Sequence, residues 1–233
     1  MIREAIILAG GLGTRLREAV PDLPKSMAQV AGKPFLSYIL NYYQTGGIEK
    51  FIFAIGYKSA VIEEFIQKTL RPGSYEFSVE QEPLGTGGAI RLACSKAIQE
   101  NVLVLNGDTF FRIDQNALAE FHQKNESDCS LSLKPMHDFD RYGVVLLNGN
   151  NSVRSFEEKK FYRSGMINGG VYALQVEKFM QESLPEKFSF EKDYLEKFFS
   201  RRKIFGLVQD KYFIDIGIPE DYRRAQTELL QNV

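Results

Sequence analysis

Residues 4–16 read EAIILAGGLGTRL, an apolar strand pattern that runs directly into a glycine-rich loop. Ala5–Leu8 is a continuous apolar run, which is typical of a central strand buried on both faces of a parallel sheet. Gly10–Gly13 then lie in the loop after that strand. Glycines at such a place let the backbone approach a ligand closely and turn its N–H groups toward an anion. A glycine turn before a helix can also be purely structural, so the loop is a candidate anion site and no more.

Strand and helix patterns alternate outward from this loop through the first half of the chain, as in a parallel sheet covered by helices. Strands are expected over residues 51–55, 77–79 and 102–105, and helices over 35–43, 60–65 and 89–98. The second half is richer in β-structure, with expected strands over 130–133, 144–147, 153–156, 171–174 and 212–214 and helices over 191–199 and 220–230. Because the sequence contains no repeat, linker or low-complexity tract, we expect one domain over residues 1–233.

Composition excludes several classes of protein. With 44% hydrophobic and 25% charged residues, the chain is neither disordered nor collagen-like nor a coiled coil. The 29 Lys and Arg against 30 Asp and Glu give a net charge of −1, which argues against duplex nucleic acid as the main partner. Cys94 and Cys129 form no CxxC motif, so we expect buried apolar thiols in a reducing compartment. His122 and His137 lie near neither cysteine, and zinc is not expected.

The N-terminus carries no targeting signal that the sequence reveals. It enters the first strand pattern without a basic segment or a long apolar segment, unlike a secretory signal peptide. No apolar run approaches the ~20 residues that a membrane helix needs. We therefore expect a cytoplasmic protein without a membrane partner.

Two familiar phosphate-binding motifs fail on this sequence. The dinucleotide fingerprint needs a third glycine where Leu16 stands, and an acidic residue after the second strand, where Gly56-Tyr57-Lys58 is found instead. The P-loop needs Gly-Lys followed by Ser or Thr, but Gly32-Lys33 is followed by Pro34. The glycine loop therefore matches neither of these two motifs.

Two cations follow the loop, Arg15 and the lysine of Pro24-Lys25-Ser26-Met27. Each alone is more typical of a solvated surface charge. Together with the glycines they describe a polyphosphate clamp, because Arg and Lys neutralise charge that develops during phosphoryl or nucleotidyl transfer.

Two aspartates stand at expected strand ends, Asp108 after Leu105-Asn106-Gly107 and Asp215 within Phe213-Ile214-Asp215-Ile216-Gly217. A lone aspartate at such a place is commonly a turn former. As a pair they are a candidate site for Mg²⁺, which binds through one or two carboxylates together with substrate phosphates. The residues alone leave both interpretations open.

These motifs resemble a known family. Residues 10–16 (GGLGTRL) and 24–27 (PKSM), with Val30 and residues 32–35 (GKPF), closely resemble the signature of the sugar-1-phosphate nucleotidyltransferases. Further stretches are similar to the D-glycero-α-D-manno-heptose 1-phosphate guanylyltransferases of bacterial surface-polysaccharide pathways: LNGDTFF (105–111), DFDRYG (138–143), SFEEK (155–159), EKFSFE (186–191) and YFIDIGIPEDY (212–222). The resemblance implies a Rossmann-like three-layer α/β sandwich with a mixed, mostly parallel central sheet and a β-rich C-terminal sugar-binding portion.

The resemblance also implies roles for particular residues. The nucleotide-binding set is Leu8, Ala9, Gly10, Gly11, Gly13, Thr14, Arg15, Lys25, Gln81, Gly85, Thr86, Gly87, Asn106 and Asp108. Within it, Arg15, Lys25 and Asp108 are the catalytic residues, and Asp108 and Asp215 hold Mg²⁺ or Mn²⁺. The sugar-phosphate set is Gly143, Glu158, Lys159 and Asn168. Without the resemblance, the segment around Gln81 reads as a tight turn and the charge run 157–160 as a solvated face.

The implied reaction is transfer of GMP from GTP to a heptose 1-phosphate, giving GDP-heptose and pyrophosphate. A mannose-1-phosphate guanylyltransferase, or an enzyme for another hexose 1-phosphate, is the alternative enzyme. A catalytically silent nucleotide-sugar-binding regulatory subunit is the alternative from another class, and the intact set of charged site residues argues against it. The expected partners are thus a nucleoside triphosphate and a sugar 1-phosphate, and a homo-oligomer stays open.

Overall fold

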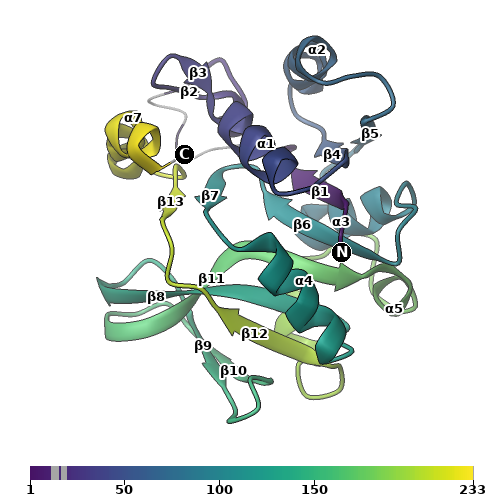
Figure 1. The fold of residues 1–233 in the computed structure, drawn as a ribbon, viewed down its shortest axis with the longest axis vertical. Helices are drawn as coiled ribbons and strands as arrows, with labels where there is room; N and C mark the ends of the chain where they lie inside the picture. The colour runs from purple at the N-terminus through teal and green to yellow at the C-terminus, as the bar shows by residue number, and fades with distance from the viewer. Residues whose placement is uncertain (12–15, 17–19, 233) are drawn as a thin grey trace.

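The computed structural model describes residues 1–11, 16 and 20–232 as an α/β fold (Figure 1). The strands are β1 (Glu4–Leu8), β2 (Gln29–Val30), β3 (Lys33–Pro34), β4 (Lys50–Ile55), β5 (Tyr75–Val79), β6 (Asn101–Asn106), β7 (Thr109–Phe111), β8 (Cys129–Phe139), β9 (Val144–Leu147), β10 (Val153–Glu157), β11 (Tyr162–Gln175), β12 (Ile204–Val208) and β13 (Phe213–Asp215). The helices are α1 (Phe35–Thr45), α2 (Ser59–Thr69), α3 (Gly85–Cys94), α4 (Gln115–Lys124), α5 (Val176–Met180), α6 (Glu196–Phe198) and α7 (Pro219–Asn232), with a short 3-10 helix η2 (Lys25–Met27) and a π-helix η3 (Phe190–Leu195).

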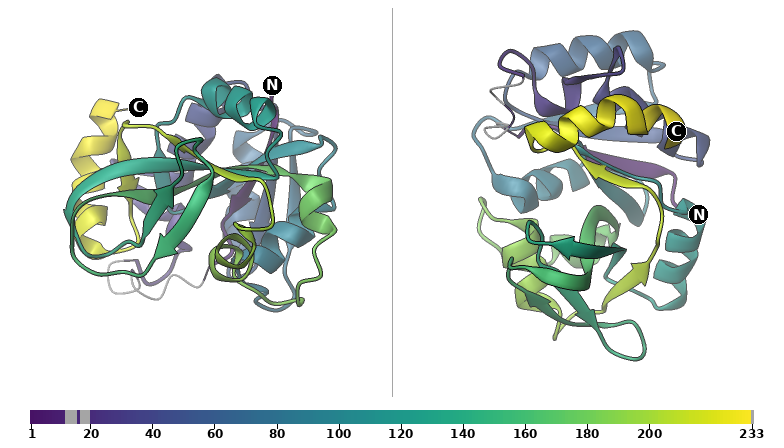
Figure 2. Two further views of the ribbon diagram at one scale, coloured as in Figure 1. Left: turned by 90° about the horizontal axis from the view of Figure 1, so that it is seen from below. Right: turned by 90° about the vertical axis from the view of Figure 1, so that its left-hand side faces the viewer.

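Most strands belong to one mixed sheet with the order β10-β9-β11-β6-β1-β4-β5, and β8 and β12 extend it from β11. Strands β5, β4, β1 and β6 are parallel, whereas β11 runs antiparallel to β6, β8 and β9. The parallel part and the antiparallel part form two tiers, clearest in the right-hand view of Figure 2, where the green strands lie below the purple and blue segments. The expected mixed, mostly parallel sheet with a β-rich C-terminal portion is confirmed.

The first strand is central, as its apolar run predicts. Ala5, Ile6 and Ile7 are fully buried. Ala5 and Ile7 face the core that contains α1, α2 and α7, whereas Ile6 faces the core that contains α3 and α5. Side chains alternate between the two faces of a strand, so one apolar run supplies both cores. Helices therefore cover both faces, and the three-layer arrangement is confirmed.

The sequence patterns missed some elements and shifted others. The helix expected over 89–98 begins at Gly85 and ends at Cys94. Strands β7 and β12 and helix α4 were not expected. Helix α4 carries a weak apolar pattern, and its start is fixed instead by the Asp114 side chain, which accepts a hydrogen bond from the Ala117 N–H at 2.9 Å.

Both cysteines are buried free thiols, as expected. Burial raises the pKa of Cys94 to about 12, so this thiol stays protonated and packs as a small apolar group. Among the described residues, no helix is both long and apolar enough to cross a membrane.

Candidate active site

A cavity of about 680 Å³ opens at the carboxyl ends of the parallel strands, where open α/β sheets bind ligands. Its lining includes most of the nucleotide-binding residues that the resemblance implied: Leu8, Ala9, Gly10, Gly11, Lys25, Gln81, Gly85, Thr86, Asn106 and Asp108. These residues come from four separate stretches of the chain, and the fold brings them to one place. Gly13, Thr14 and Arg15 lie outside the residues that the structure describes.

Glycines allow the ends of the three central strands to meet beneath this cavity. A Cβ on Gly10 would lie 2.9 Å from the Gly56 nitrogen, just after β4. A Cβ on Gly107 would lie 2.6 Å from the Leu8 carbonyl oxygen, which accepts the Gly107 N–H at 3.0 Å. Neither place has room for a side chain, because the obstructing atoms are backbone. Gly10 and Gly107 therefore let the backbone of neighbouring strand ends pack closely beneath the cavity.

Lys25 and Asp108 both line this cavity and form an ion pair with each other. Helix η2 carries Lys25, and its Nζ lies 3.3 Å from Oδ2 of Asp108 at the end of β6. The two side chains are only 16% and 34% exposed, so the ion pair is partly shielded from water. The structure thus joins a cation and a carboxylate that are far apart in the sequence.

Asp215 lies beside Asp108 because β13 pairs with β7. Asp215 stands opposite Thr109, the residue after Asp108, and the Asp108 carbonyl oxygen accepts the Ile216 N–H at 3.0 Å. Oδ1 of Asp215 accepts the Gly217 N–H at 2.7 Å. Burial and, secondly, repulsion by the Asp108 carboxylate raise the pKa of Asp215.

This carboxylate pair fits a divalent cation. Within the described part of the chain, no group of three or more His, Cys, Asp or Glu is arranged to hold a metal ion. Asp108 and Asp215 nevertheless form a partly buried pair of repelling carboxylates, and Asp108 lines the cavity. Mg²⁺ commonly binds through such a pair and completes its shell with substrate phosphates and water.

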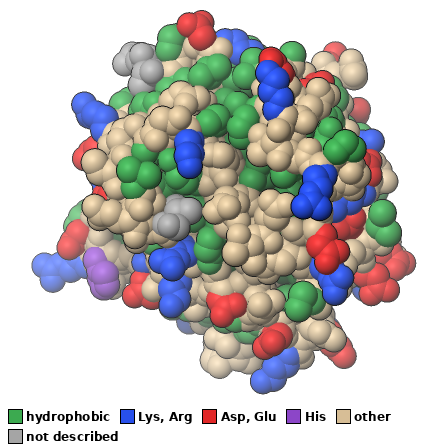
Figure 3. All heavy atoms as spheres, turned by 45° about the horizontal axis from the view of Figure 1, so that its top comes forward, with side chains coloured by type: hydrophobic (Ala, Val, Ile, Leu, Met, Phe, Trp, Pro, Cys, Tyr) green, Lys and Arg blue, Asp and Glu red, His purple; other side chains and the backbone are tan. Residues whose placement is uncertain are grey.

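Charges of both signs are spread over the face that Figure 3 shows, and hydrophobic and uncharged atoms lie between them. This distribution suits a small anion met by a few cations. Whether the chain avoids nucleic acid stays a prediction.

The glycines at the start of α3 divide into two groups. Gly85 lines the cavity with a positive φ of 72°. Gly87 is buried away from the cavity lining, and its N–H donates to the Phe188 carbonyl at 3.0 Å. A Cβ on Gly87 would meet the Phe188 ring at 2.1 Å. The structure therefore gives Gly87 a packing role, and its contact with a nucleotide stays a prediction.

The residues implied to bind the sugar phosphate gather at one end of the antiparallel tier, outside the cavity lining. Val144 pairs with both Ile167 and Glu157, so the neighbouring Gly143 stands in register between Asn168 and Glu158. Lys159 follows in the exposed connection from β10 to β11. The strand register thus assembles this second set.

Glu191 is a cavity residue to which the sequence interpretation gave no role. Its Oε2 accepts hydrogen bonds from the Thr86 hydroxyl at 2.9 Å and the Ser189 hydroxyl at 3.2 Å. Its Oε1 accepts one from the Tyr172 hydroxyl at 3.4 Å, and Tyr172 in turn accepts one from the Asn168 amide at 2.8 Å. Glu191 therefore connects both predicted sets. Glu191 is the last residue of the EKFSFE stretch that supported the family resemblance, but the sequence did not show that it would contact Thr86 and Tyr172.

Comparisons with known proteins agree with this geometry. The family model described as "Nucleotidyl transferase" matches residues 4–232, and the chain belongs to this family. It is 50% identical to the D-glycero-alpha-D-manno-heptose 1-phosphate guanylyltransferase of Aneurinibacillus thermoaerophilus over 97% of this chain and 98% of that protein. It is 47% identical to the enzyme of the same name from Campylobacter jejuni, over 94% of this chain and 96% of that one.

A solved structure has the same fold. The crystal structure of HddC from Yersinia pseudotuberculosis complexed with GMP-PN superimposes with a TM-score of 0.88. The two sequences are 38% identical, and the match covers 98% of this chain and all of the other.

Proposed function

We propose that the chain transfers GMP from GTP to D-glycero-α-D-manno-heptose 1-phosphate, giving GDP-heptose and pyrophosphate. The observation that carries this proposal is the cavity at the carboxyl ends of β1, β4 and β6, which collects the glycine loop, Lys25 and Asp108 in a chain about half identical to two such guanylyltransferases. The base and the sugar rest on that similarity. The reaction class rests on both the similarity and the site.

On the nucleotide side, the triphosphate lies over Gly10 and Gly11, and Lys25 neutralises part of its charge. Arg15, although outside the described residues, belongs to the same predicted clamp. Asp108 and Asp215 are the side chains that would hold Mg²⁺ or Mn²⁺. When bound, such an ion neutralises phosphate charge and helps to align the groups for in-line displacement.

On the sugar side, the Lys159 ammonium binds the sugar phosphate and Glu158 accepts hydrogen bonds from sugar hydroxyls. Gly143, through its backbone, and Asn168, through its amide, complete this set. A sugar 1-phosphate held there attacks the α-phosphorus of the nucleotide through a phosphate oxygen. The new P–O bond forms as the bond to pyrophosphate breaks.

The chemistry needs no general base. A phosphate monoester has a second pKa of about 6, so the attacking oxygen is already largely ionised at neutral pH. Neither histidine lines the cavity. Catalysis therefore rests on positioning two anions and on neutralising their charge.

We further propose that residues 1–233 act as one catalytic domain, since a single sheet runs through both tiers. Free buried thiols at Cys94 and Cys129 favour the cytoplasm as its location.

A matrix of substrates tests the proposal. Pyrophosphate release is measured with Mg²⁺ and each of four nucleoside triphosphates against heptose, mannose, glucose and N-acetylhexosamine 1-phosphates. We expect GTP with the heptose 1-phosphate to give the highest kcat/KM. Equal values with mannose 1-phosphate would contradict the heptose assignment, and no release with any pair would favour a silent regulatory subunit.

A further inference from the structure

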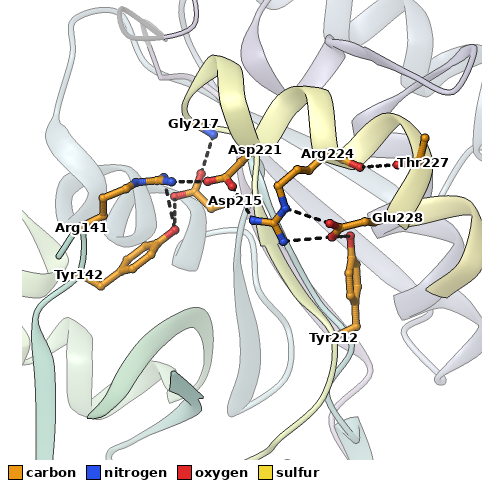
Figure 4. Close-up of polar contacts among 9 residues, drawn as sticks. All are labelled: Arg141, Tyr142, Tyr212, Asp215, Gly217, Asp221, Arg224, Thr227 and Glu228. Carbon is orange, nitrogen blue, oxygen red and sulfur yellow. Dashed lines mark hydrogen bonds and ion pairs between the residues drawn. The ribbon is translucent and has the colours of Figure 1, made fainter. Parts of the chain in front are cut away.

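A polar network joins α7 to the segment between β8 and β9, beside the carboxylate of Asp215 (Figure 4). Arg141 and Tyr142 lie in this segment, directly before Gly143. The Arg141 guanidinium forms an ion pair with Oδ2 of Asp221 in the first turn of α7. The Tyr142 hydroxyl donates to Oδ2 of Asp215 at 3.4 Å.

Arg141 contacts Tyr142 in two ways, because its Nη2 donates to the Tyr142 hydroxyl at 3.5 Å and its guanidinium lies over the ring. Asp221 is only 7% exposed, and its second oxygen accepts a hydrogen bond from Arg224 at 2.8 Å, so the carboxylate that anchors Arg141 is itself held. The Arg141 guanidinium also lies 5.4 Å from the centre of the Tyr142 ring, on which it stacks. The ring also makes an edge contact with Phe213 at 6.1 Å and packs against a small buried cluster that includes Val144.

Tyr142 in turn restricts Asp215. With Gly217 donating to Oδ1 and Tyr142 donating to Oδ2, both oxygens of the Asp215 carboxylate have a fixed donor. A phenol hydroxyl is protonated at neutral pH, so Tyr142 is a donor to this carboxylate. Each carboxylate oxygen still has a lone pair free for a ligand.

Helix α7 carries this arrangement to the nucleotide side as well. The Tyr222 hydroxyl donates to the Gln29 carbonyl at 2.7 Å, and the Gln226 side chain accepts the Ala31 N–H at 2.9 Å. These contacts are to β2 and the turn after it, just past the helix that carries Lys25. Helix α7 therefore contacts both the segment that leads to Gly143, through Asp221, and the segment that follows Lys25, through Tyr222 and Gln226.

We propose that Tyr142, anchored by the Arg141–Asp221 ion pair, is a positioning residue that orients the Asp215 carboxylate toward Asp108 for binding a divalent cation. The inference rests on the proposed function for the identity of the cation site. Donors that fix a metal-binding carboxylate typically change metal affinity or activity by about 10–100-fold when removed.

The experiment removes one hydroxyl at a time. Tyr142→Phe deletes the donor to Asp215, and Tyr212→Phe is the matched control, because the Tyr212 hydroxyl donates to Glu228 at 3.3 Å at the outer end of the same network. Mn²⁺ is titrated into the full chain, with and without GTP and without a sugar phosphate, and loss of the free-ion electron paramagnetic resonance signal reports binding. We expect about 10-fold weaker Mn²⁺ binding for Tyr142→Phe and the wild-type affinity for Tyr212→Phe. Equal affinities in the two variants would overturn the proposal.

A second pair of variants tests the anchor. Arg141→Lys removes the guanidinium that pairs with Asp221 and lies over the Tyr142 ring, whereas Arg224→Lys changes the other arginine on Asp221 and leaves Tyr142 untouched. We expect weaker Mn²⁺ binding from the first only. If both weaken it equally, the network merely packs α7, and the positioning role is wrong.

Two further readouts separate positioning from stability and from the proposed reaction. Thermal melting in EDTA should be the same for Tyr142→Phe and Tyr212→Phe, whereas a purely structural role would lower only the first. In pyrophosphate release, Tyr142→Phe should raise the Mg²⁺ concentration needed for half-maximal rate and recover kcat at saturating Mg²⁺. Because Mn²⁺ binding is measured without turnover, failure of the GTP–heptose assignment would leave this test intact.

Discussion

The carboxylate cluster and the lysine loop of the candidate site are built in opposite ways. Asp108 and Asp215 are held by strand pairing, by the Lys25 ion pair and by backbone donors, and Asp215 is partly buried. Glu158 and Lys159 lie exposed in the connection after β10. Among the described residues, no hydrogen bond or ion pair holds the Lys159 ammonium. The fold itself therefore holds the carboxylates, whereas the Lys159 charge lies in water.

The difference suits what each half is proposed to bind. A cluster of repelling carboxylates costs free energy unless the fold fixes it, so it needs a rigid frame. An exposed lysine costs almost nothing to keep in water and can close on a phosphate when one is present. Changes in the first half should therefore act on the chemical step, and changes in the second half on binding of one substrate.

The largest expected effect is that of Asp108→Asn. Loss of one carboxylate from the rigid cluster should lower kcat by roughly 10²–10³-fold, because charge stabilisation at the reacting phosphate is lost. Pyrophosphate release at saturating Mg²⁺ and both substrates measures it. The thermal melting temperature should change little, because relief of the repulsion of Asp215 offsets the loss of the ion pair with Lys25.

Asp210→Asn is the matched control for this variant. It makes the same chemical change in a surface ion pair, in which Oδ1 of Asp210 lies 2.5 Å from Nζ of Lys134. A kcat for Asp108→Asn that is close to that of the control would mean that Asp108 has no role in catalysis.

The lysine loop predicts a smaller and more selective effect. Lys159→Ala should raise KM for the sugar 1-phosphate by roughly 10–100-fold, the equivalent of one charge-assisted hydrogen bond, and should leave KM for GTP unchanged. Lys160→Ala is the control, since its Nζ lies 5.1 Å from the centre of the Tyr162 ring. If the change in KM falls on GTP alone, Lys159 does not bind the sugar phosphate.

The sequence predicts some features of the site better than others, according to whether the signal is local. The apolar run Ala5–Leu8 predicted the central strand, and the glycine motif led to the cavity, because both signals are local. The pairing of Asp108 with Asp215 needed a family resemblance, since it depends on β7 meeting β13 across about a hundred residues. Glu191 and the Arg141–Asp221 pair were missed for the same physical reason. Their partners lie in distant segments, and nothing in the local pattern of each segment marks them.

The smallest expected effect is on the nucleotide side of the site. It is measured by comparing Gly10→Ala with Gly11→Ala. The new Cβ at position 10 would lie 2.9 Å from the Gly56 nitrogen and 3.1 Å from the Ile55 carbonyl carbon, so backbone must move. Among the described atoms, a Cβ at position 11 would meet nothing within 4 Å. Gly10→Ala should therefore lower the free energy of unfolding in urea by about 1–3 kcal/mol, whereas Gly11→Ala should leave it nearly unchanged. Equal stabilities would mean that the loop yields to a methyl group, and the nucleotide side would then be no more rigid than the lysine loop.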